Sequence, residues 1–446
     1  MRATRAATFL VPFVLLMGLL AGIGPSRSRT CAAAEEAEIT LVEAVECRPR
    51  GGLPNFLAKA RAGGEVRVAY FGGSITAAPG WRVQSLDWLR KEFPRATFVE
   101  TNAAIGGTGS DLGAFRVGQD VIAQKPDLVF VEFAVNDGGA PPARIMATME
   151  GIVRQILRAG PATDICFVYT LSEPTLPDLT RGVFQRSASA MEAVADHYGI
   201  PTVHFGPEVT RRIAAGTLVF KAPKPEAAAQ PEVFSTDGVH PHVETGHRLY
   251  AEVLARAFAD IVAKSAAAAP HPLPAPLRAD NWEHAKLVPI DQTMLRGDWQ
   301  RVTPADDERA KNFQGRMPVL WKAAKPGAEL TVAFTGTLLS VYDLVGPGGG
   351  MVAVRVDDAP PKSVPRIDAY CTSWRIAQLA TGSHPQGVHR ATFTLEAAAP
   401  DKEKILFEQN RPDLAKNPDK YADNTWYASA LLLLGDLAPA GSEPQR

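Results

Sequence analysis

Between residues 65 and 265, short apolar segments alternate with longer segments of helical periodicity. The apolar segments cover residues 66–71, 97–101, 128–135, 165–170 and 202–205, and the amphipathic ones cover residues 83–93, 112–123, 143–159, 183–198 and 245–263. Residues 128–135 are almost continuously hydrophobic, as expected for a parallel strand covered on both faces. The alternation predicts βαβ units and an open parallel sheet, in which ligands bind beyond the carboxyl ends of the strands.

A second domain is indicated beyond this region. Residues 266–280 are rich in Ala and Pro, and they predict a semi-rigid linker. Residues 281–437 carry short alternating segments, such as 329–335 and 351–356, separated by glycine-rich turns. This spacing lacks helical periodicity and predicts an antiparallel β-sandwich.

The first 34 residues have the pattern of a secretory signal. Arg2 and Arg5 precede an apolar run at residues 7–23, and the small residues up to Ala34 offer a cleavage site. Cleavage there predicts a secreted or periplasmic protein whose catalytic domain spans residues 35–265, without stable membrane insertion. The alternative is an uncleaved membrane anchor, because the run approaches the length of about 20 residues that spans a bilayer.

Charge and cysteine content exclude further classes. The chain carries 47 Lys and Arg against 48 Asp and Glu, and removal of residues 1–34 would leave 43 against 48. Without a long basic block, nucleic acid is not an expected partner. No Cys-x-x-Cys pair is present, so no thiolate metal site is predicted. Whether any two of Cys47, Cys166 and Cys371 are paired stays open.

Four segments carry chemically useful side chains where an open-sheet active site is expected. They are Gly72-Gly73-Ser74 after the first strand, residues 102–110 with their glycines after the second, Asn136-Asp137 after the third, and Asp237-Gly-Val-His240 before the last helix. A serine hydroxyl activated by an imidazole, itself oriented by a carboxylate, is the arrangement of a nucleophilic hydrolase. Taken singly, the serine and asparagine segments are better explained as turns, and His240 could be a solvated loop residue. Thr76 occupies the position where the Gly-x-Ser-x-Gly elbow requires glycine, so an ordinary α/β-hydrolase elbow is not supported.

Together, in this order, the four segments resemble the SGNH, or GDSL-like, esterase superfamily. The resemblance implies a flavodoxin-like three-layer α/β/α domain and a mechanism without a metal ion or organic cofactor. It implies that Ser74 is the nucleophile, His240 the general base and Asp237 its orienting partner. The implied oxyanion donors are the Ser74 and Gly107 amides and the Asn136 side chain.

The chain departs from the superfamily pattern at two positions. Gly73 replaces the aspartate of the Gly-Asp-Ser pattern, which usually supports the nucleophile loop, so the positioning of that loop is in question. Ala134 replaces a glycine and adds a methyl group at a strand tip. The C-terminal half loosely resembles, in its strand rhythm, the jelly-roll module that accompanies this domain in some polysaccharide deacetylases.

The leading functional hypothesis is a secreted serine esterase that removes short acyl groups, with acetyl favoured, from a carbohydrate or another small ester. An O-acyltransferase with the same triad and an inactive glycan-binding protein are the alternatives. Other residues are open to two interpretations. His242 and His247 are expected to be solvated rather than metal ligands. Four aromatic residues could stack on sugars or fill the β-domain core: Tyr370, Trp374, Trp426 and Tyr427.

Overall fold

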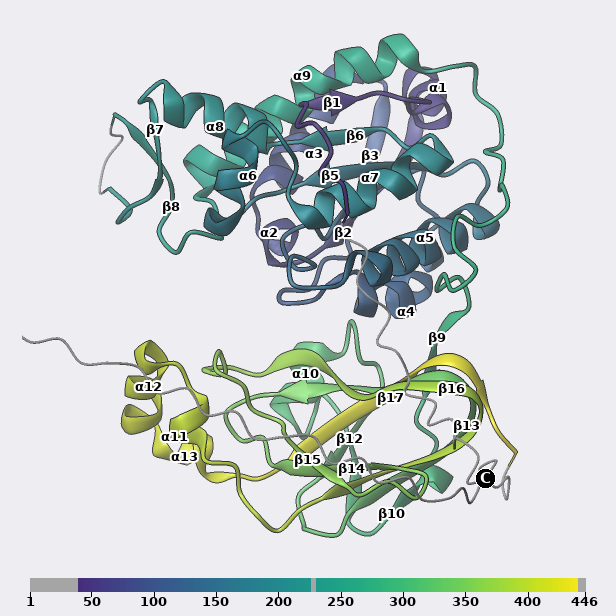
Figure 1. Ribbon diagram of the computed structural model, residues 1–446, viewed down its shortest axis with the longest axis vertical. Coiled ribbons are helices and arrows are strands. Elements are labelled where there is room, and N and C mark those ends of the chain that lie inside the picture. Colours follow the sequence, from purple (N-terminus) through teal and green to yellow (C-terminus); the bar gives the residue numbers. More distant parts are fainter. Residues whose placement is uncertain (1–38, 226–229, 440–446) are drawn as a thin grey trace, which may run out of the picture. The chain divides into compact units, whose positions relative to one another are not determined.

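The first domain is built on a six-stranded sheet with the order β1-β6-β5-β4-β2-β3 (Figure 1). The computed structural model describes residues 39–225 and 230–439, so the predicted signal at residues 1–34 lies outside the described residues. Five strands are parallel, one at each predicted position: β2 (Gly64–Gly72), β3 (Ala96–Asn102), β4 (Leu128–Glu132), β5 (Asp164–Tyr169) and β6 (Thr202–His204). The two-residue β1 (Cys47–Arg48) pairs antiparallel with β6. Counted among themselves, the parallel strands have the flavodoxin-like order 2-1-3-4-5, which confirms the predicted fold class.

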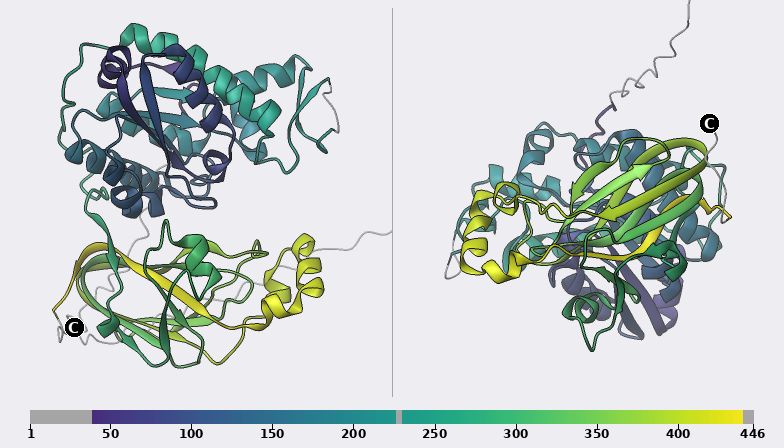
Figure 2. Two further views of the ribbon diagram at one scale, coloured as in Figure 1. Left: turned by 180° about the vertical axis from the view of Figure 1, so that it is seen from behind. Right: turned by 90° about the horizontal axis from the view of Figure 1, so that it is seen from below.

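Helices cover both faces of this sheet, as Figures 1 and 2 show. One face carries α4 (Ser110–Asp120), α5 (Pro142–Ala159) and α7 (Arg186–Tyr198), and the other carries α1 (Pro54–Ala62), α3 (Trp81–Glu92) and α9 (Arg248–Lys264). The two cores stay separate because successive side chains of a strand point to opposite faces: Phe71 packs into the first core and Tyr70 into the second. Burial on both faces explains the apolar strands.

Shorter elements connect these layers. They are α2 (Ser74–Ala77), η1 (Ile122–Gln124), η2 (Glu173–Thr175), α6 (Leu176–Thr180), α8 (Gly206–Ala214), β7 (Leu218–Lys221), β8 (Glu232–Ser235) and the π-helical turn η3 (Val243–His247). β7 and β8 form a separate two-stranded parallel pair. Because β8 ends two residues before Asp237, this pair leads directly into the predicted Asp-His segment.

The second domain is a single antiparallel sheet of nine strands. These are β9 (Ala285–Pro289), β10 (Leu295–Arg296), β11 (Trp299–Val302), β12 (Leu320–Ala323), β13 (Glu329–Val345), β14 (Met351–Val356), β15 (Lys362–Pro365), β16 (Arg375–Leu395) and β17 (Trp426–Leu437). The long β13 pairs with both β16 and β17, and its register shifts near Gly336 and Leu338. Such irregularities bend a strand. The antiparallel β class is confirmed, with the strands hydrogen-bonded in one continuous sheet.

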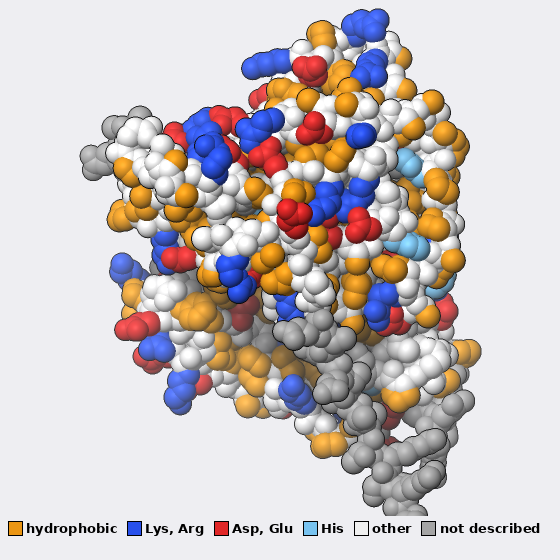
Figure 3. All heavy atoms as spheres, turned by 45° about the horizontal axis from the view of Figure 1, so that its top comes forward, with side chains coloured by type: hydrophobic (Ala, Val, Ile, Leu, Met, Phe, Trp, Pro, Cys, Tyr) orange, Lys and Arg blue, Asp and Glu red, His pale blue; other side chains and the backbone are white. Residues whose placement is uncertain are grey.

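Short helices lie in the connections of the second domain: η4 (Gln292–Met294), α10 (Glu308–Phe313), α11 (Lys402–Ile405), η5 (Glu408–Asn410), α12 (Arg411–Lys416) and α13 (Pro418–Ala422). Residues 265–284, between α9 and β9, contain no helix or strand. The cysteines Cys47, Cys166 and Cys371 are free. Within residues 39–225 and 230–439, no helix has the length and apolar character needed to cross a bilayer. On the face in Figure 3, Lys and Arg side chains stand beside Asp and Glu.

Candidate active site

The nucleophile candidate stands at the end of β2. Ser74 is half-buried and begins the one-turn helix α2, whose first backbone bond runs from the Ala77 amide to the Gly73 carbonyl. β2 lies between β3 and β4, where the strand order reverses. Ligands of doubly wound sheets bind at this switch point, outside the carboxyl ends of the strands. The fold therefore presents Ser74 at the position where a ligand site is expected.

Asp237 builds the turn that carries His240. Its Oδ1 accepts hydrogen bonds from the Val239 and His240 amides, both at 2.8 Å, and from the Ser235 hydroxyl at 3.0 Å. Gly238 has a φ of 83°, in the left-handed region that favours glycine. One carboxylate oxygen thus closes the loop, and the other remains for the imidazole.

The imidazole of His240 joins the serine to the carboxylate. His240 Nδ1 lies 2.7 Å from Asp237 Oδ2, and His240 Nε2 lies 2.8 Å from Ser74 Oγ. Burial alone would raise the pKa of Asp237, but hydrogen bonds from the His240 ring and amide, the Val239 amide and the Ser235 hydroxyl hold that pKa well below its usual range. An ionised carboxylate only accepts, so Nδ1 carries the proton and Nε2 is left to accept from the serine hydroxyl. This is the geometry that general-base activation of a serine requires.

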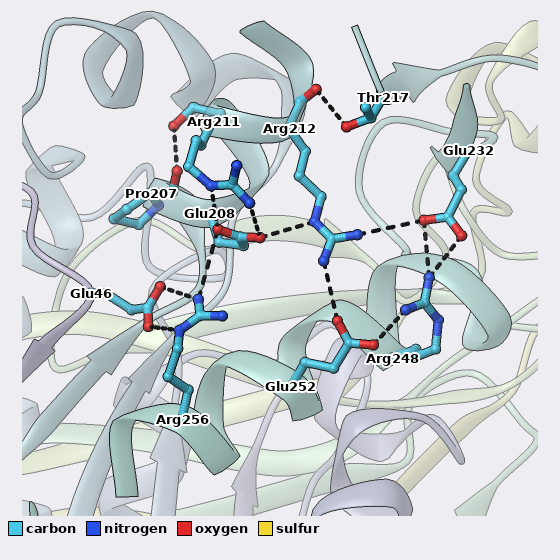
Figure 4. A network of polar contacts seen from close by, with 11 residues as sticks. Glu46, Pro207, Glu208, Arg211, Arg212, Thr217, Glu232, Arg248, Glu252 and Arg256 are labelled. Atoms are coloured by element: carbon cyan, nitrogen blue, oxygen red, sulfur yellow. Dashed lines mark hydrogen bonds and ion pairs between the residues drawn. The ribbon is translucent and has the colours of Figure 1, made fainter. Parts of the chain in front are cut away.

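A network of ion pairs anchors the strand that leads to this loop (Figure 4). Glu232, the first residue of β8, accepts from Arg248 of α9 at 2.7 and 2.9 Å. Arg212 of α8 lies 3.8 Å from Glu232, 2.9 Å from Glu208 and 3.2 Å from Glu252. The network ties β8 to α8 and α9 just before the chain enters the Asp-His turn.

Two loops lie next to Ser74: the glycine-rich turn after β3 and the polar loop after β4. A Cβ placed on Gly106 would lie 3.5 Å from Ser74 Cβ, so the turn after β3 lies close to the serine. The next residue, Gly107, has a φ of 73°. From the tip of β4, the Asn136 side chain reaches the nucleophile turn, where a Cβ on Gly73 would lie only 1.9 Å from Asn136 Oδ1. The structure therefore brings Ser74, Gly107 and Asn136, the residues predicted to carry the oxyanion donors, into one region.

A cavity of about 320 Å³ opens beside these donors. Gly107, Asn136 and Asp137 line it from the first domain, and Arg375 and Gln378 of β16 line it from the second. Asp137 Oδ1 accepts from the Ser110 amide at 2.9 Å, while its Oδ2 is buried without a hydrogen-bond partner. Burial raises the pKa of Asp137 to about 7. The lining is rich in polar groups, as a ligand with several hydroxyl groups requires.

The exposure of His242 and His247 tests whether these side chains are solvated, as expected from the sequence. His247 is 1% exposed, so its predicted solvation is wrong: its Nδ1 accepts the Trp81 amide at 3.1 Å, and burial lowers its pKa to about 4. His242 is half-buried and lies 3.1 Å from the Thr236 hydroxyl. Within the described residues, no group of three or more His, Cys, Asp and Glu side chains could hold a metal ion.

Burial also distinguishes the two interpretations of the aromatic residues in the second domain, and it shows where the methyl group of Ala134 lies. Trp426 and Tyr427 are fully buried, whereas Trp374 is half-buried and Tyr370 is 64% exposed. The first two therefore belong to the packed interior and cannot stack on a sugar. The methyl group of Ala134 is buried as well.

Sequence reasoning missed two buried charges next to the nucleophile. Arg116 of α4 is fully buried and donates to the Gly72 carbonyl at 3.3 Å, to the Ala103 carbonyl, and to Asp120 at 2.9 Å. Glu132 lies at the end of β4 and contacts the turn of Ser74 from beneath. The signal for Glu132 was present, because it is the one charged residue of the apolar run at residues 128–135. A charge at such a position must be hydrogen-bonded inside the protein.

A flavodoxin-like sheet with a Ser-His-Asp arrangement at its switch point defines the class of SGNH-type serine hydrolases. Consistent with that class, residues 70–249 match the model of the GDSL-like lipase/acylhydrolase family. The match covers the catalytic sheet and its triad residues, and it supports a carboxylic ester hydrolase. The matched segment contains all five predicted site residues.

Solved structures share the two-domain fold. A two-domain esterase (CEX) active on acetylated mannans, co-crystallized with mannopentaose, has a TM-score of 0.65 and 22% sequence identity, over 88% of this chain and 97% of that one. A second structure of a two-domain esterase (CEX) active on acetylated mannans gives a TM-score of 0.66 at 21% identity, over 88% and 98%. No match was found among curated proteins. At these identities the likeness shows that both domains have the same folds.

Proposed function

We propose that the protein is an esterase that removes acetyl groups from a carbohydrate through a Ser74-His240-Asp237 triad. The observation that carries the proposal is the chain of two hydrogen bonds, 2.8 Å from Ser74 to His240 and 2.7 Å from His240 to Asp237. The polar cavity lined by Gly107 and Asn136 supports a hydroxylated substrate. The fold shared with an esterase active on acetylated mannans supports acetyl as the acyl group.

The mechanism proceeds in two halves. His240 Nε2 removes the proton of the Ser74 hydroxyl as Oγ attacks the ester carbonyl, and the resulting imidazolium is stabilised by Asp237. The oxyanion is held by the Ser74 and Gly107 amides and the Asn136 side-chain amide, each donor contributing about 3 kcal/mol. His240 then protonates the leaving sugar hydroxyl, which departs and leaves an acetyl-serine.

Water completes the reaction. It loses a proton to His240 Nε2 and attacks the acetyl-serine, so that acetate leaves and Oγ recovers its proton. Apart from this water, the base, the nucleophile and the oxyanion donors of the proposed cycle all belong to the chain. Transfer to a second sugar would replace water with a hydroxyl group and yield an acylated acceptor instead of acetate.

Hydrolysis of p-nitrophenyl acetate by the purified protein tests the chemistry. We expect Ser74→Ala to abolish activity and labelling by a fluorophosphonate. Ser363→Ala, which alters an exposed serine of β15, is the matched control and should change neither. Equal hydrolysis by wild type and Ser74→Ala would refute the proposal. Acetate release across acetylated polysaccharides, with mass spectrometry of acceptor sugars, then identifies the substrate and separates hydrolysis from transfer.

We also propose that residues 1–34 are a cleaved secretory signal. The support is the sequence pattern of two arginines, an apolar run and small residues. N-terminal sequencing of exported protein should begin after Ala34. An intact Met1 would contradict cleavage.

A further inference from the structure

A carboxylate lies directly beneath the nucleophile turn. Glu132 is the last residue of β4 and is 1% exposed. Its Oε2 accepts a hydrogen bond from Thr76 Oγ1 at 2.8 Å, and its Oε1 accepts from Thr170 Oγ1 at 2.6 Å. The backbone amide of Gly73 donates to the same carboxylate. Three donors from two segments therefore converge on one buried side chain, and two of them, Gly73 and Thr76, lie on either side of Ser74 in the chain.

The absence of a side chain at Gly72 leaves space for the Glu132 carboxylate. Gly72 and Glu132 are paired across β2 and β4, and a Cβ on Gly72 would lie 3.0 Å from both Glu132 Oε2 and Thr76 Oγ1. It would also lie 2.5 Å from the Glu132 carbonyl oxygen. A side chain at residue 72 would therefore occupy the space through which Glu132 reaches the turn.

Packing alone does not explain an acid at this position. The neighbours of Glu132 in β4 are apolar and fully buried, and burial raises the pKa of its carboxyl group. An apolar side chain would avoid the desolvation cost that an isolated buried carboxyl carries. What the acid adds is a fixed acceptor for the Gly73 amide and the Thr76 hydroxyl.

The usual support for this turn cannot be present here. Gly73 replaces the aspartate of the Gly-Asp-Ser pattern, and the direction of its missing Cβ is occupied by Asn136 Oδ1 at 1.9 Å. Any larger residue at 73 would collide with the predicted oxyanion donor. The turn must therefore be held from another side, and Glu132 contacts it from beneath.

We propose that Glu132 is a positioning residue for the nucleophile. By holding the Gly73 amide and the Thr76 hydroxyl, it fixes the turn from which Ser74 Oγ meets His240 Nε2. It supplies the support that the absent aspartate would give. This inference rests on the proposed function, because it requires Ser74 to be the nucleophile.

The test compares two buried carboxylates of the same domain. Glu132→Gln turns one acceptor oxygen into an N–H group that faces a donor. Glu150 of α5 is the matched control: it is fully buried and also accepts three bonds, from the Tyr198 hydroxyl at 2.7 Å and from the Leu277 and Arg278 amides at 2.5 and 2.9 Å. Its partners belong to α7 and the segment after α9, so Glu150→Gln should weaken folding without touching the Ser74 turn.

The readouts are kcat and KM for p-nitrophenyl acetate, the rate of inactivation by a fluorophosphonate, and the unfolding midpoint. For Glu132→Gln we expect kcat and the inactivation rate to fall about 100-fold while KM stays within about twofold, because misplacing a reacting atom by about 1 Å costs this much. Glu150→Gln should lower the unfolding midpoint and leave both rates within about twofold of wild type.

The outcomes separate the inference from the proposed function. Wild-type rates in Glu132→Gln, together with a lowered unfolding midpoint, would overturn the positioning role and leave the esterase intact. A wild-type protein that neither hydrolyses the ester nor reacts at Ser74 would refute the proposed function, and the inference with it. Should Glu132→Gln fail to fold, Thr76→Val removes only the hydroxyl contact: a fall in kcat of about tenfold at constant KM supports the role, and an unchanged kcat overturns it.

Discussion

Replacing Gly73 with alanine tests whether the Asn136 amide must stay where the structure places it. Gly73 has φ −93° and ψ −155°, an extended conformation open to any residue, so alanine adds no backbone strain. The added methyl carbon would lie 1.9 Å from Asn136 Oδ1, 2.8 Å from its Cγ and 3.3 Å from its Nδ2. The conflict is confined to one movable side chain, and we expect the variant to fold.

The magnitude follows from the displacement. Asn136 Oδ1 must withdraw by about 1.5 Å or more to reach ordinary contact distance, and the attached Nδ2 moves with it. Loss of one oxyanion donor costs roughly 10²- to 10³-fold in kcat, or about 2.7–4 kcal/mol. We therefore expect Gly73→Ala to lower kcat for p-nitrophenyl acetate about 100-fold, with KM little changed. Gly73→Asp, which restores the family pattern, should be at least as inactive.

Steady-state kinetics of a double-mutant cycle decide the matter. If the methyl group acts by displacing Asn136, then Gly73→Ala should cost little more in an Asn136→Ala background, because the donor is already gone. Gly139→Ala, at a loop position where a Cβ would meet nothing within 4 Å, is the control and should keep wild-type kcat. A Gly73→Ala enzyme with kcat within about threefold of wild type, or fully additive losses in the cycle, would refute the reasoning.

Three further changes have defined outcomes. Asn136→Ala should reduce kcat by roughly 10²- to 10³-fold at nearly constant KM, measured with p-nitrophenyl acetate; a loss confined to KM would contradict an oxyanion role. Burial lowers the folded-state pKa of His247 to about 4, below its ordinary value of 6.5, so the unfolded chain binds this proton first as pH falls. The free energy of unfolding should therefore decrease between pH 6.5 and 4, by up to about 3 kcal/mol from this residue. Urea titrations should show a shallower decrease for His247→Gln, whose amide oxygen can still accept the Trp81 N–H, and identical slopes would contradict the assignment. Glu232→Gln breaks the pairs with Arg248 and should cost about 1 kcal/mol or less, since these side chains are partly exposed. That cost should shrink in 1 M salt, and a salt-independent cost would point to another cause.

Much of the first domain could be predicted because its signals are local. All five parallel strands lie at the predicted positions, since strands buried on both faces must be apolar throughout. Residues 128–135 were expected to form one strand, but β4 ends at Glu132, three residues earlier. The following residues are just as apolar, yet they leave the sheet in a turn closed by the Asp137 amide on the Phe133 carbonyl. Hydrophobicity reports burial, and it does not report where the ladder of hydrogen bonds stops.

In the candidate site, too, contacts between residues close in sequence could be predicted, and contacts between distant residues could not. Asp237 and His240 are three residues apart, so their relation could be inferred from spacing and from the glycine between them. The contact between His240 and Ser74 joins two residues that are 166 positions apart in the sequence, and it could be inferred only from the family resemblance. The role of His247 was misjudged because its environment comes from Trp81, which is equally remote in sequence.

The two departures from the family pattern have different physical consequences, and only one of them needs compensation. The methyl group of Ala134 is buried at the strand tip, where the backbone carbonyl of the same residue accepts the Ser187 hydroxyl at 2.6 Å, so the position accommodates a side chain. Gly73 has no such freedom, because Asn136 occupies the space of its Cβ. The absence of a side chain at Gly73 leaves room for Asn136, the proposed oxyanion donor, but it also leaves the turn without the aspartate of the Gly-Asp-Ser pattern. Glu132 can anchor it only because Gly72 also lacks a side chain. The two glycines before Ser74 therefore leave space for two different side chains: Gly73 for Asn136, the proposed oxyanion donor, and Gly72 for Glu132, the proposed support of the turn.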